Sequence, residues 1–160
     1  MNTLDELFGP RGPLARTLPG FTPRRSQLAM ANRVALAIEN RAPLVVEAGT
    51  GTGKTFAYLV PALLSGRRIV VSTGTKNLQE QLFFKDVPFL QQHFDRPLQV
   101  CYMKGRGNYA CRQKIYDWEK EGVLTGLEEV ADFQVIQEWE KTTQFGDRGE
   151  IKTLPEKSTA

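Results

Sequence analysis

The chain has 160 residues, of which 41% are hydrophobic, and a formal net charge of +3. This size predicts one domain with a core of ordinary size, and no apolar run approaches the ~18 residues that a membrane-spanning helix needs. The first residues, MNTLDELFGPRGP, lack the basic-then-apolar order of a signal peptide. We therefore expect a soluble, cytoplasmic protein without a membrane partner.

Charge is unevenly distributed along the chain. Residues 1–115 hold 16 Lys and Arg against 7 Asp and Glu, whereas residues 116–160 hold 5 against 11. A basic main part suits phosphate-bearing partners such as nucleic acid, although an unevenly charged solvated surface gives the same counts. Two cysteines, Cys101 and Cys111, are too few for a disulfide framework, and with the single His they do not complete a zinc site.

Helical patterns recur along the sequence. The first begins within TPRR, where Thr22 is expected to cap a helix that has Pro23 in its first position. The stretch KTFAYLVPALLSG predicts a second helix with Gly66 as its stop, and KNLQEQLFFKDVPFLQQHF predicts a third that is interrupted near Pro88. After Cys111 the chain is again expected to be helical, with a capping box at Thr125 and Glu128.

Three short apolar segments between these helices have the composition of buried strands. They are APLVVEA at residues 42–48, RRIVVSTGT at residues 67–75, and LQVCYMKG at residues 98–105. Strand, helix, strand, helix and strand in this order predict an α/β fold with a parallel sheet covered by helices on both faces. The final stretch, GDRGEIKTLPEKSTA, has no periodicity and is expected to be a loop or a truncated end.

The sequence VVEAGTGTGKT, residues 45–55, matches a phosphate-binding loop between a predicted strand and a predicted helix. The strict pattern has glycine where this chain has Ala48. Three glycines allow backbone N–H groups to point inward at an anion. Lys54 is expected to reach the β- and γ-phosphates and Thr55 to ligate Mg²⁺. The predicted nucleotide-binding residues of the loop are Ala48, Gly49, Thr50, Gly51, Thr52, Gly53, Lys54 and Thr55.

A glycine turn that happens to precede a lysine would also give this pattern. The loop by itself does not distinguish a kinase, a GTPase, a transporter ATPase and a helicase. Three further stretches narrow the choice, and they are GFTPRRSQLAMA, VVSTGTKNLQEQL and YMKGRGNYAC. With these stretches, residues 14–140 resemble the N-terminal part of the DinG-type helicases, bacterial superfamily 2 DNA helicases related to XPD, with a RecA-like motor domain.

The resemblance implies roles for individual residues. Gln27 matches the glutamine that recognises adenine, and an amide can pair with adenine in this way, although Gln27 could also be an exposed helix residue. Lys54 and Thr55 take the catalytic positions. The implied contacts to the DNA backbone are Thr73, Thr75, Gln79, Lys104 and Arg106. Thr75 could equally be a helix cap, and both roles are compatible.

Cys111 matches the first of four cysteine ligands to a [4Fe–4S] cluster in this family. Such a cluster needs four thiolates, so we expect it only in the complete protein. The alternative is an ordinary cysteine at a helix start. Cys101 matches no ligand position and is expected to be buried in a strand.

The resemblance also shows what the 160 residues lack. They contain no D-E-A-H sequence to complete the Mg²⁺ site, so we expect a fragment that binds ATP and Mg²⁺ without hydrolysing ATP. The expected regions are a tail (1–13), the first part of the ATP-binding domain (14–110), the start of an iron–sulfur insertion (111–145) and an end segment (146–160). The expected partner is single-stranded or forked duplex DNA, bound by a monomer.

Two other readings of the sequence remain open. One is a small nucleotide-binding protein that is complete in itself. The other is a different P-loop enzyme such as a nucleotide kinase, which would need a lid with clustered arginines and a phosphate-acceptor site. Neither feature is recognisable in the sequence.

Overall fold

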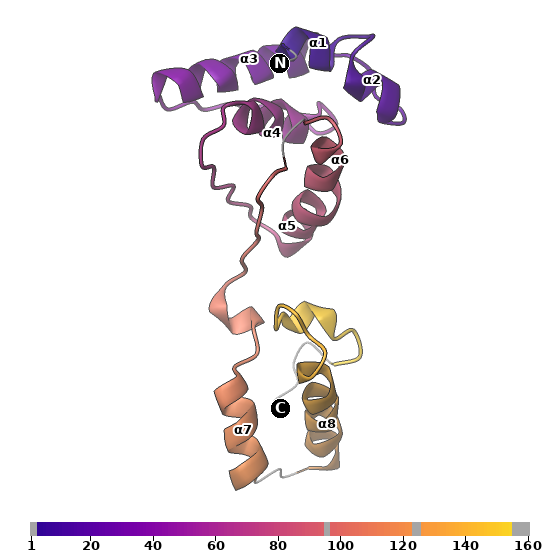
Figure 1. The fold of residues 1–160 in the computed structure, drawn as a ribbon, viewed down its shortest axis with the longest axis vertical. Helices are drawn as coiled ribbons and strands as arrows, with labels where there is room; N and C mark the ends of the chain where they lie inside the picture. The colour runs from indigo at the N-terminus through magenta and orange to yellow at the C-terminus, as the bar shows by residue number, and fades with distance from the viewer. Residues whose placement is uncertain (1–2, 95–96, 123–125, 155–160) are drawn as a thin grey trace. The chain divides into compact units, whose positions relative to one another are not determined.

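The structure is a computed structural model that describes residues 3–94, 97–122 and 126–154. The chain divides into two compact units, residues 1–101 and residues 102–160. The regular elements of the described residues are all helices (Figure 1). No helix in these ranges has both the length and the apolar character needed to cross a membrane.

The first unit begins with two short helices, α1 (Leu4–Phe8) and α2 (Pro13–Thr17). A capping box closes the start of α1, because Thr3 accepts from the Glu6 backbone and Glu6 accepts from the Thr3 backbone. Leu7 and Phe8 are buried. Sequence reasoning treated these residues as a tail, although the T-x-x-E pattern followed by two apolar residues was a usable signal.

The long helix α3 (Arg25–Asn40) packs against α4 (Lys54–Leu64). The expected cap at Thr22 is wrong, because α3 begins at Arg25 and its N-cap residue, Arg24, makes no side-chain capping bond. The expected end of α4 is confirmed. The helix closes at Ser65, and Gly66 follows with a left-handed φ of 67°.

The third predicted helix is interrupted as expected. It consists of α5 (Lys76–Gln81), a π-helical turn (Leu82–Asp86) and α6 (Val87–Gln91), which carries Pro88. A proline ring clashes with the carbonyl four residues earlier in a regular α-helix, and the wider π turn relieves that clash. Thr75 caps α5 by accepting from the Leu78 backbone at 3.3 Å, which confirms the predicted cap.

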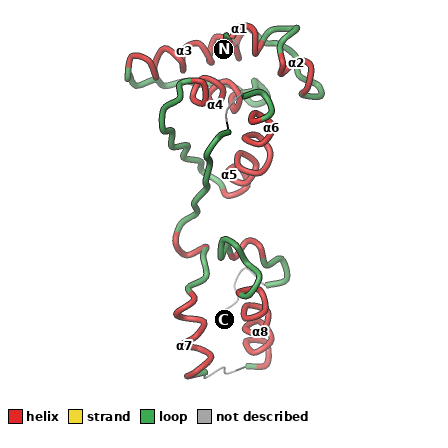
Figure 2. Tube along the Cα trace, in the orientation of Figure 1, coloured by secondary structure: helices red, strands yellow, loops and turns green. Residues whose placement is uncertain are grey.

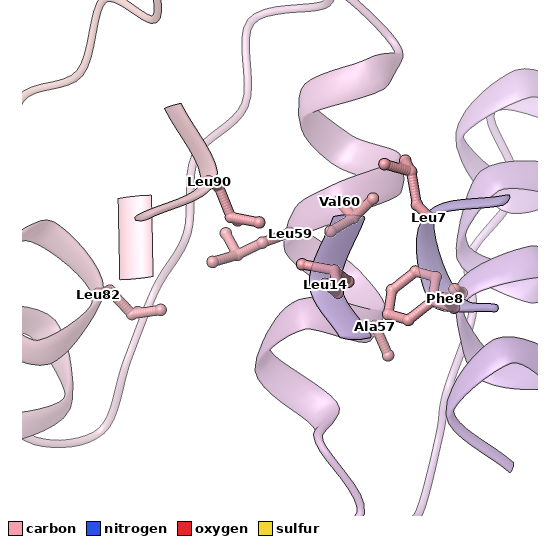
Figure 3. Close-up of a cluster of buried hydrophobic side chains, with 9 residues drawn as sticks. Leu7, Phe8, Leu14, Ala57, Leu59, Val60, Leu82 and Leu90 are labelled. Carbon is pink, nitrogen blue, oxygen red and sulfur yellow. The ribbon is translucent and has the colours of Figure 1, made fainter. Parts of the chain in front are cut away.

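One apolar core holds the first unit together (Figure 3). Its buried members come from α1, α2, α3, α4, the π-helical turn and α6, and they are Leu7, Phe8, Leu14, Ala31, Ala57, Leu59, Val60, Leu82 and Leu90. Phe56 and Phe89 add an aromatic contact between α4 and α6, with ring centroids 5.8 Å apart. The core is therefore built from helix against helix.

The predicted parallel sheet is wrong for the described residues (Figure 2). Segments 42–48, 67–75 and 98–105 contain no strand, and no backbone hydrogen bond joins any two of them. Val45 is 97% exposed and Val70 is 90% exposed, so these residues do not form the buried centre of a sheet. Cys101 is likewise exposed, which corrects the expectation of a buried strand cysteine.

The reason for this error is that a strand is stabilised by its neighbours. β-branched composition reflects how well a segment fits a half-buried pleated surface, and it supplies neither the adjacent strand nor the covering layer. An α-helix makes its backbone hydrogen bonds within its own segment, so the helices form even though the three apolar segments between them remain unpaired. The predicted α/β class is thus replaced by a helical arrangement.

The second unit contains α7 (Arg112–Glu121) and α8 (Leu127–Glu140), which face each other. Buried Ile115 and Phe133 lie between them, and the Trp118 and Phe133 rings are 6.4 Å apart. Two short 3₁₀ turns, Arg106–Asn108 and Arg148–Glu150, complete the unit. The helix expected after Cys111 is confirmed, whereas the Thr125 cap lies outside the described residues and α8 starts after Gly126.

We predict that the unforeseen helix α1 is needed for the stability of the first unit. Phe8→Ala removes a ring that is 2% exposed and should lower the free energy of unfolding by about 3–5 kcal/mol. The control is Leu36→Ala on α3, where the side chain is 48% exposed and the change should stay within about 0.5–1 kcal/mol. Denaturant unfolding followed by helical circular dichroism measures both, and equal losses would contradict the role of α1.

Candidate nucleotide-binding site

The predicted phosphate loop lies directly before α4. Gly51 and Gly53 have left-handed φ angles of 74° and 76°, and Gly53 is the N-cap of the helix that Lys54 begins. Two left-handed glycines turn the chain sharply into the helix. The first N–H groups of an α-helix have no intrahelical partners. The loop thus has the backbone arrangement that suits an anion at a helix N-terminus.

The Lys54 side chain turns back over its own loop. Its Nζ donates to the carbonyl oxygens of Ala48 and Gly49, both at 2.7 Å. Thr52 Oγ1 also donates to the Gly49 carbonyl at 2.9 Å. The ammonium group therefore lies within the curve of the loop, where it can exchange carbonyl acceptors for phosphate oxygens.

Helix α3 holds the loop through two side chains. Gln27 is 5% exposed, and its Nε2 donates to the Gly53 carbonyl at 3.0 Å. Arg24 donates from its guanidinium to the Gly51 carbonyl. Sequence reasoning assigned Gln27 to adenine recognition by resemblance, and that role stays a prediction, whereas the contacts of Gln27 and Arg24 with the loop were not predicted.

Contact between Gln27 and the loop requires glycine at position 53. A Cβ atom on Gly53 would lie 2.1 Å from Gln27 Nε2, so the end of the Gln27 side chain would have to shift. At Gly51 and Gly49 a Cβ atom would meet nothing within 4 Å. Gly53 is thus constrained both by its φ and by its neighbour, whereas Gly51 is constrained by φ alone.

The remaining loop residue with a predicted chemical role is Thr55, in the first turn of α4. Burial raises the pKa of Tyr58, one turn further along, and a hydrogen bond with the Thr55 side chain opposes that rise. Thr55 is therefore close to the Tyr58 phenol, and its hydroxyl would have to exchange this partner in order to ligate Mg²⁺.

The residues predicted to contact DNA in the first unit lie at the start of α5. Thr73 Oγ1 donates to the Thr75 carbonyl at 3.1 Å, and Thr75 caps the helix. Gln79 lies one turn into the same helix. The three residues share one short segment, and their contact with DNA stays a prediction.

Lys104 and Arg106 belong to the second unit and have different surroundings. Arg106 is exposed at the start of a 3₁₀ turn. Lys104 is 8% exposed, and its Nζ forms an ion pair with Asp147 Oδ2 at 2.6 Å. A role for Lys104 in the DNA path stays a prediction, and it would require this buried pair to open.

Asp147 is the centre of a polar network that sequence reasoning did not find. Besides Lys104, its carboxylate accepts from Tyr102 at 2.9 Å and from the Gly149 backbone at 2.9 Å. Burial by itself would raise the pKa of Asp147, but these hydrogen bonds and the Lys104 charge hold it below its usual value. Burial and the hydrogen bond to Asp147 raise the pKa of Tyr102 to about 12.

The two cysteines do not form an iron–sulfur site within this chain. A cluster needs four thiolates, and the sequence contains Cys101 and Cys111 alone. Within the described ranges, no three His, Cys, Asp or Glu residues converge in a way that could hold a metal ion. Cys111 is exposed and is the N-cap of α7, so its ligand role in a longer protein stays a prediction.

A glycine loop before a helix, with an inward lysine and a following threonine, is the arrangement of nucleotide-binding P-loop proteins. Comparison with known families narrows this class, because residues 26–144 match the DEAD/DEAH box helicase family. The chain belongs to the DEAD/DEAH box helicase family.

Several curated relatives match nearly the whole chain. The ATP-dependent DNA helicase YoaA of Haemophilus influenzae is 41% identical over 98% of the chain, and the ATP-dependent helicase DinG of Mycobacterium tuberculosis is 40% identical over 83%. The 3'-5' exonuclease DinG of Bacillus subtilis is 36% identical over 86%. The chain spans 24%, 23% and 15% of these relatives. These matches confirm the DinG-type resemblance, while no solved structure matches the chain.

We predict that Gly53→Ala destabilises the first unit by roughly 1–3 kcal/mol, because of its left-handed φ and the clash with Gln27. Gly49→Ala is the matched control in the same loop and should change stability by less than about 0.5 kcal/mol. Adding Gln27→Ala to Gly53→Ala should make the pair less destabilising than the sum of the two single changes. Thermal unfolding followed by helical circular dichroism tests this, and strict additivity would exclude the clash.

We also predict that Asp147 makes the second unit acid-sensitive. Its lowered pKa contributes stability that is present above the ordinary value of 3.8 and is lost as the pH falls through the folded-state pKa. Asp147→Asn leaves Lys104 buried without its carboxylate and should cost about 3 kcal/mol at pH 7. The difference from the unchanged chain should then shrink below about pH 4.

Tryptophan fluorescence measures this effect, because both tryptophans of the chain, Trp118 and Trp139, lie in the second unit. Glu138→Gln on the exposed side of α8 is the control with the same loss of charge. A difference between Asp147→Asn and the unchanged chain that stayed constant down to pH 2 would contradict the assignment.

Proposed function

We propose that the chain is the nucleotide-binding part of an ATP-dependent DNA helicase, and that loop 48–55 binds ATP with Mg²⁺. The observation that carries the proposal is the position of Lys54, whose Nζ lies among the loop carbonyls at the N-terminus of α4. Membership of the helicase family supports the same reading. The names of the YoaA and DinG relatives support ATP dependence and DNA as the substrate.

Gln27 is proposed to recognise adenine without giving up the loop. Its amide nitrogen carries two N–H groups, so one can donate to the Gly53 carbonyl while the other donates to N7 of adenine. Its carbonyl oxygen can accept from the N6 amino group. Because the same amide holds Gly53, adenine binding would tighten the phosphate loop directly. A guanine base has the carbonyl oxygen O6 where adenine has its N6 amino group. The Gln27 carbonyl oxygen would then face O6, and two acceptors cannot form a hydrogen bond.

In the longer protein, ATP turnover is proposed to drive the separation of DNA strands. The residues proposed to contact the backbone of single-stranded or forked DNA are Thr73, Thr75, Gln79, Lys104 and Arg106. Contacts to phosphate do not read bases, so binding should be salt-sensitive and largely independent of sequence. We further propose a monomeric, cytoplasmic protein in which Cys111 becomes an iron–sulfur ligand once the other thiolates are supplied.

The 160-residue chain itself is proposed to bind ATP without hydrolysing it. Its sequence contains no D-E-A-H segment to complete the Mg²⁺ site and position the attacking water. A single lysine and a threonine hold phosphate and metal, but neither is a general base for water.

The proposal predicts that Lys54→Ala weakens ATP binding about ten- to a hundredfold, since a charged hydrogen bond to phosphate contributes roughly 1.5–3 kcal/mol. Lys76→Ala is the matched control, because Lys76 is also the first residue of a helix but lies outside the loop. Calorimetry with ATP and with GTP measures both variants. Equal affinities for the two nucleotides would remove Gln27 from its role, and an unchanged affinity in Lys54→Ala would exclude the loop.

A further inference from the structure

Thr55, which is proposed to ligate Mg²⁺, has a side-chain partner outside the phosphate loop. Its side chain forms a hydrogen bond with Tyr58, one turn further along α4. Tyr58 is partly buried against the apolar core of the first unit. A hydroxyl oxygen is a ligand that Mg²⁺ takes together with phosphate oxygens and water, so Thr55 fits the metal. Tyr58 is therefore the side chain that first responds when Thr55 changes its partner.

A carboxylate on a neighbouring segment lies near the same phenol. Asp86 is the last residue of the π-helical turn. Burial raises the pKa of Tyr58, and the negative charge of Asp86 is close enough to raise it further. Gln81 donates from Nε2 to Asp86 Oδ2 at 3.3 Å. A carboxylate has about four acceptor sites, so Asp86 can also accept from the Tyr58 hydroxyl.

The π-helical turn is packed against the helix that carries Thr55. Leu59 of α4 and Leu82 of the turn belong to the same buried cluster (Figure 3), and the Phe56 ring contacts Phe89 of α6. The turn closes with the Val87 N–H donating to the Leu82 carbonyl. Turns of this kind are rare and often lie at functional sites. Hydrogen exchange at Val87 therefore reports directly on the turn.

We infer that Tyr58 is a positioning residue that couples the binding of ATP and Mg²⁺ to the π-helical turn. When Thr55 ligates the metal, the Tyr58 hydroxyl loses its partner and donates to Asp86 instead. The new hydrogen bond ties the end of the turn to α4. The turn follows α5, where contacts to DNA are predicted, so this exchange links the two predicted sites. The inference rests on the proposed function, because it needs ATP in loop 48–55.

The first experiment measures hydrogen exchange by mass spectrometry in the unchanged 160-residue chain. Its three states are the chain alone, the chain saturated with ATP in EDTA, and the chain saturated with ATP and Mg²⁺. Exchange in residues 82–87 should slow about tenfold in the third state alone, as one hydrogen bond to a charged group allows. Peptides from α7, in the other unit, should not change. Equal protection in EDTA and Mg²⁺, or none in either, would overturn the inference.

The second experiment compares the dissociation constants of ATP in EDTA and in Mg²⁺ by calorimetry. Asp86→Ala removes the acceptor that receives the phenol, so the ratio of the two constants should fall about tenfold. Tyr58→Phe removes the bonds of both states, and the ratio should stay within about threefold. Adding Tyr58→Phe to Asp86→Ala should restore the ratio, because no phenol then competes for Thr55. A merely structural role would leave the double variant as weak as Asp86→Ala, which would overturn the inference.

Matched controls come from the second unit. Asp117 also accepts from a glutamine, since Gln113 Nε2 donates to its Oδ1 at 2.7 Å, and Asp117→Ala should leave the ratio unchanged. Tyr116→Phe on the same helix is the control for Tyr58→Phe. Circular dichroism shows whether each variant folds. If Asp86→Ala does not fold, hydrogen exchange in the unchanged chain decides the question.

Failure of this inference is distinguishable from failure of the proposed function. ATP that binds through Lys54 without Mg²⁺-specific protection of residues 82–87 overturns the coupling and leaves the nucleotide site standing. A double variant that keeps the low ratio does the same. If the unchanged chain binds no ATP, or if Lys54→Ala leaves the affinity unchanged, the proposed function is overturned and the coupling with it.

Discussion

The hydrogen bond from Gln27 to the Gly53 carbonyl is the contact on which the candidate nucleotide site depends. A phosphate loop must hold several backbone N–H groups in one direction, and glycine-rich chain has little intrinsic preference for that conformation. In this structure α3 supplies the constraint, through Gln27 at Gly53 and Arg24 at Gly51. The packing of α3 against α4 places both partners, so the loop is fixed from the helical side.

This constraint explains how a recognisable phosphate loop exists without the predicted sheet. The extended segment before the loop makes no strand pairing, and Val45 within it is almost fully exposed. The loop nevertheless has two left-handed glycines and an inward lysine, because the contacts that fix it come from α3 and α4. The conformation of the loop in this structure therefore does not depend on strand pairing, although the sequence predicted the loop at the end of a strand in a sheet.

Sequence reasoning succeeded where the determining interactions are local. The end of α4 at Gly66, the Thr75 cap and the interruption beside Pro88 all follow from side chains within a few residues of the feature they produce. The sheet failed because pairing depends on residues far along the chain. For the same reason the pattern of glycines and Lys54 was readable, whereas the Arg24 contact and the Asp147 network were not. The Arg24 contact joins residues that are 27 positions apart, and the contacts of Asp147 with Lys104 and Tyr102 join residues that are 43 and 45 positions apart.

Net charge along the sequence is a poor guide to what each part of the molecule presents to a partner. Asp147 and Lys104 neutralise each other inside the second unit, and Arg112 pairs with Glu140 at 2.7 Å across α7 and α8. Charges that are paired in this way contribute little field at a distance, so the acidic count of residues 116–160 overstates the repulsion that a phosphate would meet locally. The kind of partner that the second unit can bind therefore depends on the side chains that line each of its surfaces. The sum of charges does not distinguish a paired carboxylate from an unpaired one.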